Sequence, residues 1–213
     1  LGTAQLTISY DSVLQRYSLS DPLKQFNESL VGITGNGTLA LTIDPLFFTS
    51  QPAVSRVVVL LNGGNDRVTI ANNIASSLRP FSANGGAGPD TVAGTSGADA
   101  VSIDGLNGQT FLGVDFADVE IFDGAGGVDS VIGTTGNDRF ILVGTEVADN
   151  ASGFRFQDIE DFVGGAGTDS VVGTGGDELV SINGLNGNTL VGITFSDVEA
   201  FDAAYKLCIL AGI

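Results

Sequence analysis

The chain has 213 residues and a formal net charge of −17, because 25 acidic residues stand against 8 basic ones. A surface of that sign repels nucleic acid and anionic membranes, so we expect no nucleic-acid partner and no membrane insertion. Histidine is absent and Cys208 is the one cysteine, which excludes His-based triads, most zinc and copper sites and an intrachain disulfide.

Residues 1–84 contain short apolar runs separated by Gly, Asn and Asp turns. Leu6–Tyr10 alternates apolar and polar side chains, which predicts a half-buried strand. Val57–Leu61 leads into a Gly-Gly turn that ends in Asp66, 24 residues before a similar turn ends in Asp90. We therefore interpret residues 1–84 as degenerate coils of the architecture that follows them.

Three copies of one repeat follow, at residues 85–123, 124–163 and 164–203. Each copy opens with a Gly-rich turn, here called the first corner, which ends in Asp90, Asp129 or Asp169. Nine residues later a second corner ends in Asp99, Asp138 or Glu178. Each copy then ends in a closing motif, Phe-x-Asp-(Val/Ile)-Glu-x-Phe, at residues 116–122, 156–162 and 195–201.

This period of 39–40 residues indicates an architecture in which each copy packs against the next. A Gly-rich corner followed by alternating apolar residues predicts a short strand after a tight turn. We predict an all-β solenoid of parallel strands, one continuous domain with two coils in each repeat. Gly144–Gly153, where the second copy is one residue longer, should protrude as a loop. The closing-motif phenylalanines should stack in two columns, Phe116 with Phe156 and Phe195, and Phe122 with Phe162 and Phe201.

Over residues 62–203, the string Gly-Gly-x-Gly-x-Asp-x-apolar resembles the nonapeptide of RTX-type (haemolysin-type calcium-binding) β-rolls. The longer repeat with its closing motif is similar to repeats of large secreted bacterial surface proteins. The resemblance implies a right-handed parallel β-helix or β-roll that is exported to the outside of the cell or the bacterial cell surface.

The corner acids are candidate calcium ligands, because calcium takes six to eight oxygens and suits carboxylates together with turn carbonyls. Alternatively, each acid hydrogen-bonds within its own turn and needs no cation. The residues leave both interpretations open, so calcium is the one cofactor indicated and none is required. The candidate ligands are Asp66, Asp90, Asp99, Asp129, Asp138, Asp169 and Glu178.

The closing motif carries a second pair of acids in each copy, Asp118 with Glu120, Asp158 with Glu160, and Asp197 with Glu199. Paired carboxylates serve glycosidases, but three near-identical copies argue against a single active site. The repeats also carry few basic residues to hold an acidic polysaccharide. We therefore predict that the chain is not an enzyme and that these acids form a solvated edge.

Residues 204–213 depart from the repeat as an apolar C-terminal tail. Such a tail either caps its own last coil or packs on the first coil of a neighbouring subunit, since the ends of a solenoid are strand edges. The N-terminal strand Ala4–Tyr10 is the natural complement of Leu207–Ile213. This pairing predicts head-to-tail self-association.

The preferred function is that of a non-enzymatic extracellular structural protein, a solenoid subunit of a surface filament, layer or adhesin stalk with cell-surface or glycan contacts. Repetition without a singular reactive site is the reason for this preference. The first alternative is a calcium-binding RTX-like secreted module. The second is a polysaccharide-active β-helix enzyme.

Overall fold

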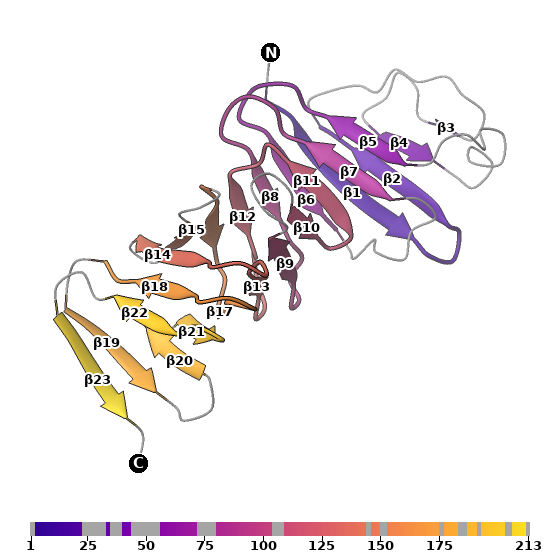
Figure 1. Ribbon diagram of the computed structural model, residues 1–213. Helices are drawn as coiled ribbons and strands as arrows, with labels where there is room; N and C mark the ends of the chain where they lie inside the picture. The colour runs from indigo at the N-terminus through magenta and orange to yellow at the C-terminus, as the bar shows by residue number, and fades with distance from the viewer. Residues whose placement is uncertain are drawn as a thin grey trace. The chain divides into compact units, whose positions relative to one another are not determined.

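The computed structural model describes residues 3–22, 33–34, 40–43, 56–71, 80–103, 109–143, 146–149, 153–174, 177–182, 187–190, 193–202 and 206–211. Over these residues the chain is all-β, without a helix, and most strand pairs are parallel (Figure 1). The predicted all-β class is therefore confirmed. None of the described segments is a helix long and apolar enough to cross a membrane.

The chain divides into two compact units. The first unit comprises Leu1–Thr95 and Thr110–Val119, and the second comprises Ser96–Gln109 and Glu120–Ile213. The first sequence repeat, residues 85–123, is thus shared between the units, whereas the second and third repeats lie wholly in the second unit. The strand β10 (Gln109–Phe111) falls at the boundary.

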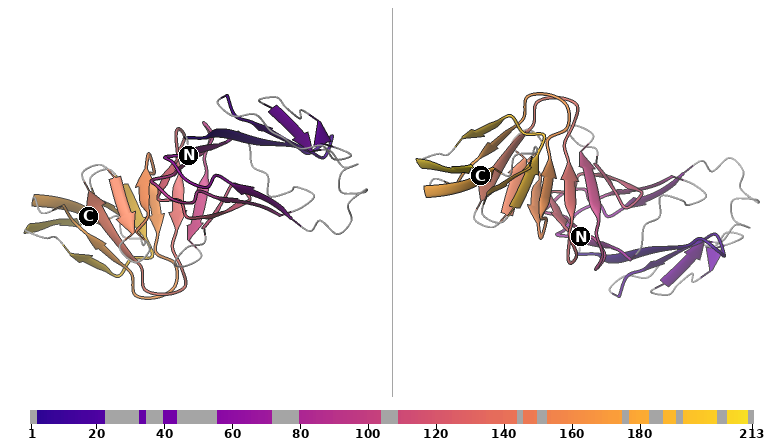
Figure 2. Two further views of the ribbon diagram at one scale, coloured as in Figure 1. Left: turned by 90° about the horizontal axis from the view of Figure 1, so that it is seen from above. Right: turned by 90° about the horizontal axis from the view of Figure 1, so that it is seen from below.

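The first unit holds two sheets, which Figure 2 shows as separate layers. One has the strand order β8-β6-β1-β2-β4-β3, and the other has the order β5-β7-β11 with all strands parallel. The strands are β1 (Gln5–Asp11), β2 (Arg16–Ser20), β3 (Ile33–Thr34), β4 (Ala40–Ile43), β5 (Val57–Leu60), β6 (Arg67–Ile70), β7 (Phe81–Asn84), β8 (Thr91–Ala93) and β11 (Val114–Ala117). The rings of Tyr17 and Phe81 lie 5.6 Å apart and join the two sheets.

The second unit also holds two sheets, with the orders β12-β16-β15-β14-β18-β22 and β9-β13-β17-β21-β20-β19-β23. Its strands are β9 (Ala100–Ile103), β12 (Ile121–Asp123), β13 (Ser130–Ile132), β14 (Arg139–Val143), β15 (Glu146–Asp149), β16 (Arg155–Gln157), β17 (Asp161–Val163), β18 (Ser170–Val172), β19 (Asp177–Ile182), β20 (Gly187–Leu190), β21 (Ile193–Ser196), β22 (Ala200–Asp202) and β23 (Lys206–Ala211).

Each complete repeat contains an antiparallel meander that the sequence pattern does not predict. The second repeat runs β13, then the meander β14-β15-β16, then β17, and the third runs β18, the meander β19-β20-β21, then β22. β14, which ends at Val143, pairs antiparallel with β15, which begins at Glu146. Within Gly144–Gly153, Glu146–Asp149 is therefore a strand paired on both sides and not part of a protruding loop.

Successive repeats also exchange sheets. The meander of the second repeat lies in the sheet of β12 and β18, whereas the meander of the third lies in the sheet of β13 and β17. Phe122 consequently pairs in register with Phe156, and Phe162 with Phe195. The predicted columns are wrong for this reason, because corresponding phenylalanines of adjacent repeats lie in different sheets.

Phenylalanine rings make up the core of the second unit. Phe162 stacks on Phe195 of its own sheet at 5.5 Å between ring centroids. It also contacts Phe140 and Phe156 of the facing sheet, at 5.3 and 5.7 Å. All four rings are less than 2% exposed, so Phe162 lies at the centre of the packing between the sheets.

Candidate functional site

The corner aspartates are buried. Six of the seven predicted ligands have exposed fractions of 7% or less, namely Asp66, Asp90, Asp99, Asp129, Asp138 and Asp169. The seventh, Glu178, belongs to β19, and its side chain lies outside the described residues. A buried carboxylate needs hydrogen-bond partners, and the main chain supplies them.

In the first unit the main-chain N–H of Ala4 donates to Oδ1 of Asp66. The N–H of Asp66 in turn donates to Oδ1 of Asp90 at 2.7 Å. The second unit repeats this bond twice, from Asp99 N–H to Oδ1 of Asp129 and from Asp138 N–H to Oδ1 of Asp169, each at 2.8 Å. We call these successive bonds the corner ladder.

The corner ladder differs from the predicted turn chemistry in one respect. The carboxylates of Asp90, Asp129 and Asp169 each accept from a corner 24–31 residues earlier in the chain, a contact between corners that the turn interpretation does not include. Each bond therefore joins two corners that are far apart in the sequence and adjacent in the structure.

The glutamates of the closing motif belong to the same ladder. The N–H of Asp129 donates to Oε2 of Glu160 at 2.8 Å, and the N–H of Asp169 donates to Oε2 of Glu199 at 2.6 Å. Glu199 is exposed and Glu160 is half-buried, so these two acids remain in contact with solvent while each accepts one main-chain hydrogen bond. A sequence signal exists, because each ladder acid stands two residues before an inward apolar residue, as Glu160 does before Phe162.

The second carboxylate oxygen of three corner acids has a different environment. Oδ2 of Asp66, Asp129 and Asp169 is buried without a hydrogen-bond partner in the described part of the chain. Oδ2 of Asp129 lies 2.5 Å from the point that a Cβ on Gly124 would occupy, and the carbonyl oxygen of Asp158 lies 2.3 Å from it. The third repeat has the same arrangement at its first corner. Glycine is required there because two oxygens occupy the space that a Cβ would need.

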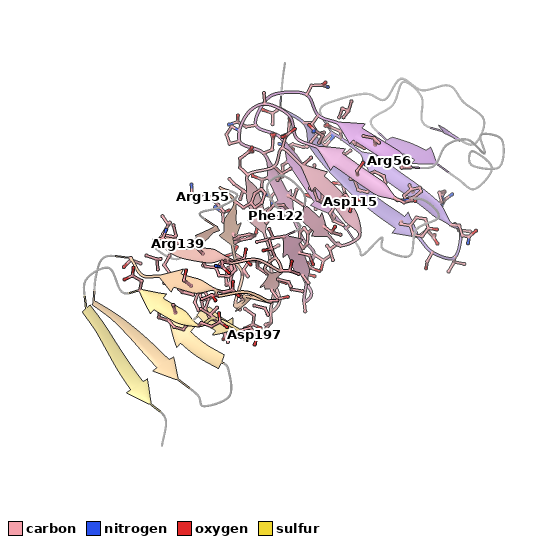
Figure 3. All side chains as sticks on the ribbon, viewed as in Figure 1. Arg56, Asp115, Phe122, Arg139, Arg155 and Asp197 are labelled. Carbon is pink, nitrogen blue, oxygen red and sulfur yellow. The ribbon has the colours of Figure 1, made fainter. Side chains whose placement is uncertain are left out.

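The aspartate of the closing motif supplies that carbonyl. Asp118, Asp158 and Asp197 have φ values of 51°, 50° and 49°, in the left-handed region that Asp tolerates better than most residues. Their carbonyl oxygens lie against Gly85, Gly124 and Gly164. Asp197, labelled in Figure 3, directly follows β21. The closing-motif aspartate therefore has a backbone role.

The second corner of the second repeat satisfies both oxygens of its carboxylate. Oδ2 of Asp138 accepts the main-chain N–H of Thr134 at 2.8 Å and its hydroxyl at 3.1 Å. At the equivalent position of the first corner, Ala125 has φ = 71° and donates its N–H to Asp123 instead. In the second repeat the two corners therefore differ in whether the turn bonds its own acid.

Burial raises the pKa of Asp129, and the charges of Asp99, Glu160 and Asp158 raise it further, against a lowering by the main-chain hydrogen bond from Asp99. The buried, incompletely bonded carboxyl is the physical cause.

The ability of the corners to hold calcium depends on how many oxygen atoms lie close enough together to coordinate one ion. At the first corners of the second and third repeats, one carboxylate oxygen and one carbonyl oxygen approach the same glycine. Within the described residues, no three acidic or cysteine side chains group as a metal site would require. Calcium binding at these corners stays a prediction.

Comparison with protein-family models, with curated proteins and with solved structures found no match to this chain.

Proposed function

We propose that the chain is a non-enzymatic extracellular structural protein, the subunit of a bacterial surface filament, layer or adhesin stalk. Its fold is a right-handed parallel β-solenoid in which each repeat of about 40 residues carries an antiparallel meander. The corner ladder is the observation that supports this proposal best. Its bonds from Asp99 to Asp129 to Glu160, and from Asp138 to Asp169 to Glu199, join successive passes at one register.

The use of these acids favours a structural role over catalysis. A catalytic carboxylate must reach a substrate, whereas Asp129 and Asp169 are 1% and 0% exposed and bond to main-chain amides. The arrangement also recurs from repeat to repeat.

Head-to-tail association needs strand edges that are open, and this changes which strands we propose for it. β1 pairs with β2 on one edge and β6 on the other, so Ala4–Tyr10 has no free backbone edge. β5 pairs with β7, its partner among the described residues, and exposes Val58 by 50% and Leu60 by 64%. We therefore propose that β5 of one subunit meets the Leu207–Ile213 segment of the next, part of which forms β23.

Sedimentation velocity and negative-stain microscopy over a range of protein concentrations test the assembly. The wild type should form oligomers that lengthen with concentration, and Val58→Lys should abolish them by placing a charge at the apolar edge. Val13→Lys is the matched control, since Val13 is 88% exposed on the turn between β1 and β2. Monomers at all concentrations, or equal assembly by both variants, would reject this interface.

A calcium-binding secreted module is the second candidate. The Oδ2 atoms of Asp66, Asp129 and Asp169, which are buried and have no hydrogen-bond partner among the described residues, favour it, because a cation would neutralise them. Calorimetric titration with calcium should then release or absorb heat at a defined stoichiometry, and Asp169→Asn should reduce that stoichiometry. A flat titration of the wild type rejects this candidate.

A further inference from the structure

Two Asn-Gly-Gly sequences lie within the part of the chain that the structure describes. Asn62–Gly64 follows β5, and Asn84–Gly86 begins at the last residue of β7. An asparagine followed by glycine can lose its side-chain amide, because the main-chain nitrogen of the glycine attacks Cγ and glycine has no side chain to hinder the approach. The reacting groups are the same in both sequences, so a difference between them in the folded chain comes from the structure.

The main chain at Asn62 forms a strained turn. Its φ is 76°, and the N–H of Gly63 donates to the carbonyl oxygen of Leu61 at 3.2 Å. This combination defines a γ-turn of the rare kind, with ψ of about −65° at its centre. Such a ψ turns the nitrogen of Gly63 toward Cβ of Asn62, whereas the ψ of about +115° in a parallel strand turns it away. The turn therefore brings the attacking nitrogen closer to the side chain.

The side chain of Asn62 is exposed and weakly held. Its Nδ2 donates to the carbonyl oxygen of Leu60 at 3.3 Å, which is long for a hydrogen bond between nitrogen and oxygen. Water therefore reaches the amide, and the ammonia that leaves has an open path. Gly63 itself is buried, so its N–H loses its proton more slowly than in an unfolded chain, and the unfolded rate is an upper limit.

The second sequence is held at both reacting groups. Nδ2 of Asn84 donates to Oδ2 of Asp118 at 2.7 Å, and the N–H of Gly85 donates to the carbonyl oxygen of Ala117 at 3.0 Å. Asn84 is also half-buried at the end of an extended strand. A reaction at Asn84 must break both hydrogen bonds before the ring closes, which raises its barrier.

We propose that Asn62 is a site of spontaneous deamidation with water as the one co-reactant. The nitrogen of Gly63 loses its proton and bonds to Cγ of Asn62, and the Cγ–Nδ2 bond then breaks to release ammonia. Water next opens the resulting five-membered succinimide at either carbonyl carbon. The product is aspartate, or isoaspartate in which the main chain runs through Cβ and Cγ. Overall one water is consumed and one ammonia is released, without oxidation or reduction.

The modification has a structural consequence, because the turn is bonded to the next corner. The carbonyl oxygen of Asn62 accepts the N–H of Ala87 at 2.9 Å, and the N–H of Gly64 donates to the carbonyl oxygen of Ala87 at 2.9 Å. Isoaspartate lengthens the main chain here by one methylene group, so the two bonds lose their common register. The chain after β5 is thereby loosened from the corner that ends in Asp90. This chemistry occurs within one chain and does not rest on the proposed assembly.

Incubation of the full chain at mildly alkaline pH, followed by tryptic digestion and mass spectrometry, tests the proposal. The deamidated form of the peptide Val57–Arg67 should accumulate at least about tenfold faster than deamidation at Asn84, because the reaction at Asn84 breaks two firmer hydrogen bonds. Fragmentation of the peptide separates aspartate from isoaspartate. In urea the two sites should react at similar rates, and both faster than in the folded chain, since the same residues follow each asparagine.

Asn62→Gly is the matched control variant, because glycine adopts a φ of 76° without strain and removes the reacting side chain. Val57–Arg67 from the incubated variant should stay unmodified, which shows that the neighbouring Asn65 does not react. Amide hydrogen exchange at Ala87 should become faster in the incubated wild type and stay constant in incubated Asn62→Gly.

Three results would overturn the inference. These are equal rates at Asn62 and Asn84 in the folded chain, no product at Asn62 by the time the chain in urea is converted, and the same product in Asn62→Gly. Unchanged amide exchange at Ala87 in the deamidated wild type would refute the loosening of the turn. Each measurement reads one chain, so a failure of the proposed assembly leaves these outcomes unaffected.

Discussion

At the scale of single residues, the carboxyl group of Asp129 has two oxygens in unlike surroundings. Oδ1 accepts the N–H of Asp99, whereas Oδ2 is buried without a partner among the described residues and lies near the carbonyl of Asp158. Asp138 differs in that Oδ2 accepts from Thr134. The same substitution should therefore have opposite effects at the two positions.

Asp129→Asn should raise the free energy of unfolding by about 1 kcal/mol, since the amide keeps the acceptor for Asp99 and places a donor where Oδ2 was. Asp138→Asn should lower it by about 1–3 kcal/mol, because the amide nitrogen cannot accept from Thr134. Urea unfolding of the two variants measures both values. Equal destabilisation by the two substitutions would contradict our account of the corners.

Ala125 carries backbone strain that its counterparts avoid. Its φ is 71°, and the equivalent residues of the other repeats are Gly86 and Gly165, with φ of 95° and 94°. Ala125→Gly should stabilise the chain by about 0.5–1 kcal/mol, as relief of left-handed strain exceeds the entropy that glycine loses on folding. Ala166→Gly, one residue further on in the third repeat, should destabilise by a similar amount, because its φ is not positive. Thermal unfolding compares the two, and stabilisation by both would show that the strain argument fails.

At the scale of elements, strand packing in the second unit depends on Phe162. This ring contacts Phe195 in its own sheet and Phe140 and Phe156 in the facing sheet. Phe162→Ala should lower the free energy of unfolding by about 3–5 kcal/mol, because a cavity opens where both sheets meet.

Phe201→Ala is the comparison, since Phe201 is partly exposed and its ring contact is with Phe195 at 6.1 Å. The loss of unfolding free energy in Phe201→Ala should be clearly smaller than in Phe162→Ala. Urea unfolding followed by far-ultraviolet circular dichroism measures both losses. A larger loss for Phe201 would place the centre of the packing elsewhere.

At the scale of the whole molecule, the charge of −17 and the buried carboxyl group of Asp129 link stability to pH. The pKa of Asp129 is raised in the folded chain, so the folded state binds its proton more tightly than the unfolded state. The stability that this proton contributes is fully present below the unfolded pKa, and it is lost as the pH rises through the folded pKa. Stability from this group therefore falls with rising pH.

The advantage of Asp129→Asn over the wild type should accordingly be larger at pH 7 than near pH 4, because the asparagine does not titrate. Urea unfolding of both proteins at the two pH values gives the difference. Adding salt should raise the stability of both at pH 7 by screening the mutual repulsion of the acids. An advantage that shrinks toward pH 7 would show that the sign of the Asp129 contribution is opposite.

The sequence by itself determined the local structure of this protein. Gly-rich corners ending in acids such as Asp129 and Asp169 predicted tight turns, and alternating apolar residues such as Val131 predicted short strands with one buried face. These predictions succeed because turn conformation and the two-residue alternation of a strand depend on neighbours in the chain.

Only the tertiary structure decided which strands pair and what the acids bond. The register of Phe122 with Phe156, the exchange of sheets between repeats and the place of Glu160 in the corner ladder all join residues about 30 apart. An apolar residue at alternate positions satisfies either sheet equally well, so the pattern does not select a partner. That selection follows from packing the rings of Phe140, Phe156 and Phe162 together, which no short segment contains.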